Sequence, residues 1–248
     1  MSRSKSKSPS RATKGTSSKS GKSGKSTATS VTDVYLYAPN LIGYTRIALL
    51  IAAFSVASDN AVLFYGCYFV SSWLDAVDGH VARLYGQSSR FGAVLDMLTD
   101  RCATASLCVV LAGFFPAYAS AFRALIALDF ASHYTHMYAT LLLQKESHKQ
   151  IDPSQNWFLR LYYHNRLVLG LMCAANEGFF LSLYMVHFLP GTVLPLPLVG
   201  PTPFFVAFTA LCFPFMVVKQ ILSVIQWHGA CQEIARFDAA AANTKAAQ

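Results

Sequence analysis

Four aspartates in the middle of the chain have the residue type and the spacing to do chemistry. Asp75 and Asp78 are three residues apart, and Asp96 and Asp100 are four apart, so on helices each pair lies on one face. The short connection YGQSSRF between the two pairs predicts a hairpin of antiparallel neighbouring helices, which Gly92 would allow to pack closely. We therefore expect all four carboxylates to converge in one pocket.

Four carboxylates that lie close together repel one another, so either some are protonated or a cation is present. A set of ligands made only of oxygen suits a hard cation, and we expect Mg²⁺ or Mn²⁺. Carboxylates that bridge two such ions form a clamp for phosphoryl chemistry. The alternative is that the four acids pair with the neighbouring arginines Arg83, Arg90 and Arg101.

The composition separates the chain into a basic tail and a neutral, apolar body. Of 248 residues, 54% are hydrophobic and 13% charged, whereas an average soluble domain has about 25% charged residues. Residues 1–32 contain eight Lys or Arg and no Asp or Glu before Asp33, and the rest of the chain contains twelve of each sign. We expect a disordered, Ser/Lys-rich cytosolic tail over 1–32 and no binding of nucleic acid, because the body has no surplus positive charge.

Apolar stretches predict an all-α membrane protein with six transmembrane helices. They cover roughly residues 41–58, 60–84, 101–119, 121–143, 167–189 and 203–227. A span needs about 20 mainly apolar residues, and the distribution of Lys and Arg between the connections predicts that both termini are cytosolic. We expect residues 33–230 to form the six-helix domain, followed by a cytosolic C-terminal tail over 231–248.

The second span is short, because its uncharged part runs only from Asn60 to Leu74. To cross the bilayer the helix must continue through Asp75, so the acidic residues are expected at the cytosolic membrane edge. Carboxylates in such a place are costly and by default functional. Simple pairing with local arginines does not explain why they cluster there.

The acidic stretch matches a family signature, DxxDGxxARx8GxxxDxxxD, at every fixed position. The matching residues are Asp75, Asp78, Gly79, Ala82, Arg83, Gly92, Asp96 and Asp100. The chain therefore resembles the CDP-alcohol phosphatidyltransferases, whose fold has six transmembrane helices. Over about residues 34–190 it is most similar to the phosphatidylinositol synthase branch of that family. This second likeness rests on APNLIGYTRI (38–47), DGHVAR (78–83), RFGAVLDMLTDRC (90–102), LDFASH (128–133) and ESHK (146–149).

The resemblance implies a role for each matching position. Metal ligands are implied at Asp75, Asp78, Asp96 and Asp100, and Asp100 is also implied as the general base. Contacts to the CDP-diacylglycerol head group are implied at Gly79, Arg83 and Ser89. Further contacts to the nucleotide or the acceptor are implied at Asn40 and Arg46.

The resemblance also implies an activity. Two Mg²⁺ or Mn²⁺ ions would bridge the diphosphate of CDP-diacylglycerol, the phosphatidyl group would pass to myo-inositol, and CMP would leave. The alternative is a sister enzyme with glycerol 3-phosphate, serine or choline as acceptor, because the shared motif does not separate these. A homodimer in the endoplasmic reticulum is implied, with the Golgi and the mitochondrion as alternative addresses. A rival of another class is a divalent-cation channel or transporter that uses the acidic cluster.

Polar residues outside the motif have less specific patterns. Asp129, His133 and His136 share one face of the fourth predicted span, where we expect a buried polar network or, as the alternative, a metal or proton relay. Asn176 and Glu177 are expected partners of that network. Candidates for an acceptor pocket are His164, Arg166, Arg101 and Lys145. Lys219 is expected either to contact an anionic group or to extend to the membrane interface.

Overall fold

The computed structural model describes residues 29–143, 166–191, 193–196 and 200–246. Nearly all of these residues are helical, which confirms the expected all-α class. The helices are α1 (Val31–Tyr35), α2 (Ala38–Ser55), α3 (Ala61–Leu84), α4 (Arg90–Phe114), the 3₁₀ helix η1 (Pro116–Tyr118), α5 (Ala119–Leu142), α7 (Arg166–Phe188) and α8 (Phe204–Ala246). An antiparallel ribbon between α7 and α8, which the sequence did not predict, pairs β1 (Val193–Leu196) with β2 (Gly200–Pro203), with Val193 opposite Pro203.

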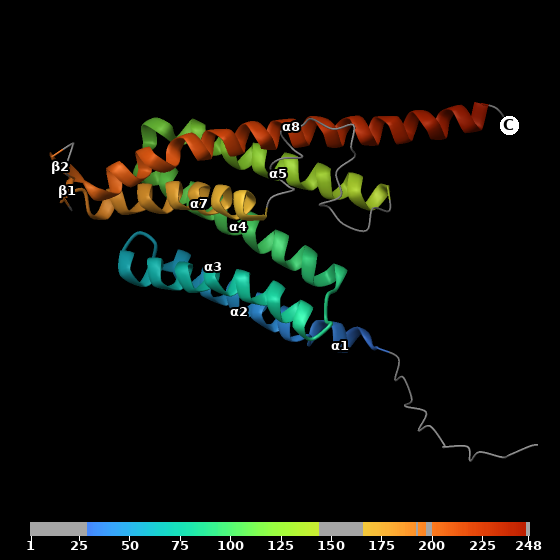
Figure 1. The fold of residues 1–248 in the computed structure, drawn as a ribbon, viewed down its shortest axis with the longest axis horizontal. Helices are drawn as coiled ribbons and strands as arrows, with labels where there is room; N and C mark the ends of the chain where they lie inside the picture. Colours follow the sequence, from blue (N-terminus) through green and yellow to red (C-terminus); the bar gives the residue numbers. More distant parts are fainter. Residues whose placement is uncertain (1–28, 144–165, 192, 197–199, 247–248) are drawn as a thin grey trace, which may run out of the picture.

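The long helices run along one common direction and form a bundle (Figure 1). The α3–α4 connection, α1 and the end of α8 lie at one end of the bundle, and the β-ribbon and the α2–α3 turn lie at the other. The end of α8 projects beyond the other helices, because this helix continues for 43 residues. The predicted membrane span over 203–227 is therefore only its first part, and an alanine-rich stretch with high helix propensity extends it.

Three of the described helices are long and apolar enough to cross a membrane. They are Ala38–Ser55, Val168–Phe188 and Phe204–Ala246. The remaining long helices, α3, α4 and α5, contain 24, 25 and 24 residues, each about 36 Å of helix at 1.5 Å per residue. Their length suffices for a span, but they carry the charged residues of the site described below. Many large apolar side chains point outward, among them Val62, Trp73 and Val109, as expected for a surface that faces lipid.

The apolar core joins α2, α3, α4 and α7, and α5 and α8 also contribute buried residues to it. Phe64 and Tyr184 stack with their ring centroids 4.2 Å apart, and both side chains are fully buried. The Tyr184 hydroxyl donates a hydrogen bond of 2.8 Å to the carbonyl of Ala57 at the α2–α3 turn. A buried hydroxyl that finds such a partner adds direction to apolar packing. This core fixes α7 against the α2–α3 pair.

The helix ends near the acidic motif have specific caps. Ser89 is the N-cap of α4, and its hydroxyl accepts a 3.0 Å hydrogen bond from the Gly92 amide. Gly86 in the α3–α4 connection has a positive φ of 62°, which favours glycine. The neighbouring Gln87 side chain accepts a 2.9 Å hydrogen bond from the Ala38 amide at the start of α2. The connection is thus tied to α2 as well as to the two helices that it joins.

The prediction that α3 and α4 pack closely is wrong. α2 packs against both α3 and α4, which make little direct contact with each other. Gly92 faces α2, because a Cβ at this position would lie 2.7 Å from Asn40 Oδ1. The physical reason is electrostatic: two helix faces that both present carboxylates repel, and α2 brings an arginine between them.

Gly92→Ala is expected to destabilise the protein by about 1–3 kcal/mol through overpacking. Asn40 cannot yield easily, because its side chain is 1% exposed and its Nδ2 donates a 2.6 Å hydrogen bond to the Val34 carbonyl. The measurement is the unfolding midpoint of each purified protein in detergent. Gly113→Ala on the same helix is the matched control, since a Cβ there meets nothing within 4 Å. Equal midpoints for the two variants would contradict the close α2–α4 contact.

Candidate active site

The four aspartates converge as the sequence predicts, and they converge on Arg46 of α2. Arg46 Nη2 lies 2.6 Å from Asp75 Oδ1 and 2.7 Å from Asp100 Oδ1. Arg46 Nη1 lies 2.7 Å from Asp96 Oδ1 and 3.1 Å from Asp78 Oδ2. One planar guanidinium therefore contacts both carboxylates of α3 and both of α4, which suits its fixed fork of donors. We call these five residues the Arg46 cluster.

The Arg46 cluster is closed on one side and open on the other. The Arg46 side chain is 3% exposed and that of Asp78 is 12% exposed, whereas those of Asp75 and Asp96 are 42% and 46% exposed. The Ser71 hydroxyl donates a 3.3 Å hydrogen bond to the Arg46 carbonyl and so links α3 to α2 behind the cluster. A ligand can therefore reach the carboxylates from the exposed side while the arginine holds them from beneath.

The carboxylate oxygens of the cluster are suitable ligands for a divalent metal. Oxygens of Asp75, Asp78 and Asp96 lie within 4.8 Å of one another, and oxygen-only ligands suit Mg²⁺ or Mn²⁺. The single positive charge of Arg46 cannot balance four carboxylates, so added positive charge would stabilise the arrangement. Each described contact of a carboxylate with Arg46 involves one oxygen, and a carboxylate has two oxygens that can each accept more than one partner.

A second polar cluster lies beside the first, between α4 and α5. Arg101 Nη1 donates a 2.7 Å hydrogen bond to Asp129 Oδ1, and both side chains are largely buried. Arg101 Nη2 also lies 3.8 Å from Asp100 Oδ2, so this arginine faces both clusters. His133 Nδ1 lies 2.9 Å from the Asp129 carbonyl oxygen. This arrangement agrees with the buried polar network expected for the face of α5.

The other expected members of that network contact different partners. Ser72 of α3 donates a 2.9 Å hydrogen bond to Glu177, and Gln220 of α8 donates one of 3.2 Å to Asn176 Oδ1. The residues therefore tie α7 to α3 and to α8 rather than to the Asp129 face. Lys145 and His164 lie outside the described residues, and the structure does not describe the side chain of Arg166.

The predicted head-group residues lie along the α3–α4 end of the site. Gly79 and Arg83 are one helical turn apart, and Arg83 Nη1 would be 3.4 Å from a Cβ at Gly79. Arg83 is exposed and Ser89 is half-buried at the α4 cap. Asn40 of α2 instead packs against α1 and α4, and its amide nitrogen donates a hydrogen bond to the Val34 carbonyl. Its predicted contact with the nucleotide or the acceptor stays a prediction.

The central position of Arg46 is what sequence reasoning missed. The sequence analysis treats this residue as a contact to the nucleotide or the acceptor, and considers Arg83, Arg90 and Arg101 as partners of the acids only as the alternative to a metal site. Among those three, only Arg101 approaches a motif carboxylate in the described ion pairs. The signal was present, because Arg46 is the one charged residue in the stretch 41–58, and such a residue normally pairs in the bundle interior.

Comparisons with known proteins agree with the site. Residues 36–233 match the family described as CDP-alcohol phosphatidyltransferase. No solved structure matches the chain significantly.

Several curated relatives bear the name CDP-diacylglycerol–inositol 3-phosphatidyltransferase. The protein of Candida albicans is 44% identical over 213 residues, which cover 85% of this chain and 86% of the relative. The protein of Schizosaccharomyces pombe is 42% identical over 220 residues, covering 83% and 92%. The human protein is 41% identical over 208 residues, covering 84% and 95%. The matched region includes the whole Arg46 cluster, and the chain belongs to the CDP-alcohol phosphatidyltransferase family.

Proposed function

We propose that this protein is a transferase that moves the phosphatidyl group of CDP-diacylglycerol to myo-inositol and releases CMP. The observation that carries the proposal is the convergence of the four motif carboxylates on Arg46, in a chain 41–44% identical to three relatives named for this reaction. A divalent-metal site of this kind suits a diphosphate substrate, whose charge the carboxylates alone would repel.

The residues of this chain have separate tasks in the reaction. Asp100 accepts the proton of an inositol hydroxyl, whose oxygen attacks the phosphorus that carries diacylglycerol as the bond to CMP breaks. Arg83 holds a phosphate of the donor, and Gly79 allows the nucleotide to approach the α3 backbone. Ser89 offers its hydroxyl to the head group in addition to capping α4.

A metal would be held by the carboxylates on the open side of the Arg46 cluster. Two ions of Mg²⁺ or Mn²⁺, held by Asp75, Asp78, Asp96 and Asp100, would neutralise the diphosphate and the departing CMP. Arg46 keeps the four carboxylates at short distance from one another and so pre-forms the donor set. Pre-formation matters because moving like charges together during binding would cost affinity.

The bundle spans the membrane with six helices, and both termini lie in the cytosol. In support, α1, the α3–α4 connection and the end of α8 lie at the same end of the bundle (Figure 1), and the tail over 1–32 is basic. The catalytic domain covers 33–230, and 231–248 is a C-terminal extension of which α8 forms the part up to Ala246. The protein acts as a homodimer in the endoplasmic reticulum, as the family resemblance implies.

A panel of acceptors tests the function. Purified full-length protein with CDP-diacylglycerol and Mg²⁺ is expected to release CMP with myo-inositol, and not with glycerol 3-phosphate, serine or choline. Labelled acceptor must appear in the lipid product, which distinguishes transfer from hydrolysis. CMP release with one of the other acceptors, and none with myo-inositol, would assign the chain to a sister activity in the same family.

A further inference from the structure

An acidic side chain that has no task in the proposed reaction lies in the middle of α7. Glu177 is half-buried, and the helix around it is apolar enough to cross a membrane. A carboxylate in such a segment is costly and by default functional. Neutral groups of the same helix, Asn176 and Ser182, already join α7 to α8 through contacts of 3.2 and 2.8 Å. Helix packing alone therefore does not require a carboxylate at this position.

The partners of Glu177 are hydroxyl groups of α3. The Ser72 hydroxyl donates a 2.9 Å hydrogen bond to Glu177 Oε1. The buried Tyr68, one helical turn earlier on α3, also interacts with this carboxylate. A carboxylate only accepts hydrogen bonds and has room for several donors, and bonds to a charged acceptor are the stronger ones. Glu177 is thus suited to hold one face of α3.

This contact fixes the register of α3 against α7. Near the ribbon, Phe64 of α3 stacks on Tyr184 of α7 with the ring centroids 4.2 Å apart. Ser72 lies eight residues after Phe64, and Glu177 lies seven residues before Tyr184, so each helix presents the same face again after two turns. The two antiparallel helices therefore meet twice, through stacked rings and, two turns nearer the Arg46 cluster, through a hydrogen-bonded carboxylate.

The second of these contacts comes immediately before the acidic motif. Asp75 follows Ser72 by three residues, which is about 4.5 Å along the helix axis. The adjacent Ser71 donates to the Arg46 carbonyl, so two consecutive serines join this point of α3 to α2 and to α7. Helix α7 also packs against α4, which carries the other two carboxylates. Because α3 and α4 make little direct contact, α7 can hold one in place relative to the other.

We propose that Glu177 is a positioning residue for the metal site. Through Ser72 it sets the height and rotation of α3 where the motif begins, and so the distance between the carboxylates of α3 and those of α4. Arg46 joins the same carboxylates from α2, and Glu177 holds their helix from α7 without touching a ligand. The inference rests on the proposed metal-dependent transfer and adds to it a residue that acts through another helix.

The test is the binding of Mn²⁺ to the purified full-length protein, measured from the electron paramagnetic resonance signal of the free ion. Glu177→Leu is expected to raise the Kd for Mn²⁺ about tenfold, within the range typical for residues that orient metal ligands. The freed Ser72 hydroxyl can bond to the backbone of its own helix, so the fold should persist. Glu177→Gln keeps one acceptor oxygen, and its Kd should lie between those of the wild type and Glu177→Leu.

Ser72→Ala removes the same contact from the other side. It should raise the Kd for Mn²⁺ as Glu177→Leu does, and the double variant should bind no more weakly than either single one, because both changes delete one interaction. Ser182→Ala is the matched control, since this hydroxyl lies 2.8 Å from Thr209 Oγ1 and joins α7 to α8 rather than to α3. The control should lower the unfolding midpoint while the Kd for Mn²⁺ stays unchanged.

An unchanged Kd for Mn²⁺ in the folded Glu177→Leu and Ser72→Ala proteins would overturn the proposal, since the contact would then serve stability only. Equal weakening by Glu177→Gln and Glu177→Leu would overturn it too, because charge rather than the contact would set the affinity. Use of another alcohol by the wild type would refute the proposed acceptor without affecting the Mn²⁺ titration. Absence of Mn²⁺ binding by the wild type would refute the metal site and this inference together.

Discussion

Replacement of Asp100 by asparagine is expected to lower the rate of phosphatidyl transfer by about 10²–10⁴-fold, the range typical for loss of a general base. An asparagine side chain cannot accept the proton of the acceptor hydroxyl. The substitution also removes one negatively charged ligand from the metal site. Its carbonyl oxygen can still accept the 2.7 Å hydrogen bond from Arg46 Nη2. The fold should therefore persist while catalysis is lost.

The measurement is kcat for CMP release by purified wild type and Asp100→Asn, with circular dichroism and the unfolding midpoint as checks of the fold. Asp59→Asn is the matched control, because Asp59 is an exposed aspartate in the turn before α3. Activity within a few-fold of the wild type in Asp100→Asn would contradict the assignment. If ion flux changed while transferase activity did not, the rival interpretation as a channel or transporter would gain support.

Arg46→Met is expected to destabilise the protein by about 3–5 kcal/mol, the cost typical of removing one partner from a buried ionic group. The variant leaves the carboxylates of Asp75, Asp78, Asp96 and Asp100 facing one another without the guanidinium that contacts all four. Because divalent cations supply positive charge to the same oxygens, Mg²⁺ should recover more stability in this variant than in the wild type. Transfer activity should also fall, because the four carboxylates no longer have the arrangement that binds the metal.

Unfolding midpoints in detergent, with EDTA and with Mg²⁺, measure this effect. Arg46→Lys should fall between wild type and Arg46→Met, because an ammonium keeps the charge but lacks the fork that reaches both helices. Arg123→Met serves as the control, since Arg123 is exposed near the start of α5. An Arg46→Met midpoint equal to that of the wild type in EDTA would refute the central role of Arg46.

Much of the fold could be predicted from patterns of charge and apolarity. The predicted stretch 60–84 corresponds to α3 at Ala61–Leu84, and 121–143 corresponds to α5 at Ala119–Leu142. Helix α4 begins earlier than the predicted 101, at Arg90. The polar first turns lie outside the predicted membrane span, but the spacing of Asp96 and Asp100 already placed these two residues on one helix face.

The candidate site was predictable to the level of single helix faces. The spacing of residues along a helix determines which of them share a face. This was enough to predict that Asp75, Asp78, Asp96 and Asp100 converge. Which helix packs between two others is a tertiary property that spacing does not report. For that reason the position of α2, and with it the role of Arg46, emerged only from the structure.

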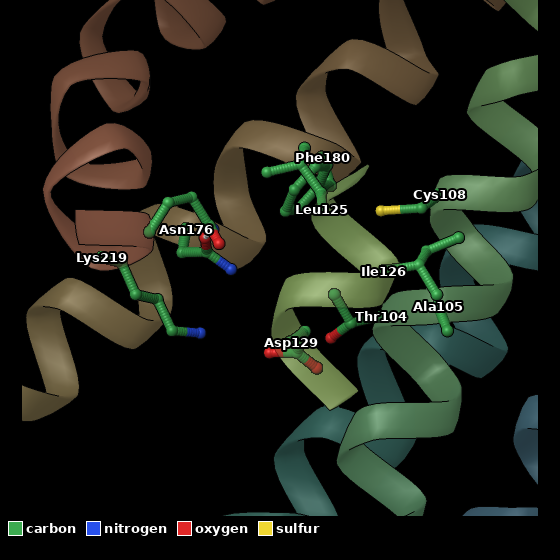
Figure 2. Close-up of a pocket in the computed structure, with 10 residues that line it drawn as sticks. Thr104, Ala105, Cys108, Leu125, Ile126, Asp129, Asn176, Phe180 and Lys219 are labelled. Atoms are coloured by element: carbon green, nitrogen blue, oxygen red, sulfur yellow. Dashed lines mark hydrogen bonds between the residues drawn. The ribbon is translucent and has the colours of Figure 1, made fainter. Parts of the chain in front are cut away.

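A small cavity between α4, α5, α7 and α8 illustrates the same limit. Asp129, Asn176 and Lys219 lie on three different helices and are separated by more than 40 residues along the chain, so no local pattern connects them. Sequence reasoning placed each in the membrane interior as a polar residue with an open role. The arrangement of α5, α7 and α8 places them around one small cavity (Figure 2).

The most direct test of the central claim is metal-dependent formation of labelled lipid by the purified wild type. Protein, CDP-diacylglycerol and labelled myo-inositol are incubated after treatment with EDTA, and again after Mg²⁺ or Mn²⁺ is restored. We predict no labelled phosphatidylinositol with EDTA, and with metal one molecule of CMP released for each molecule of labelled lipid formed. Undiminished transfer after removal of metal, or CMP release without labelled lipid, would contradict a metal-dependent phosphatidyl transfer at the Arg46 cluster.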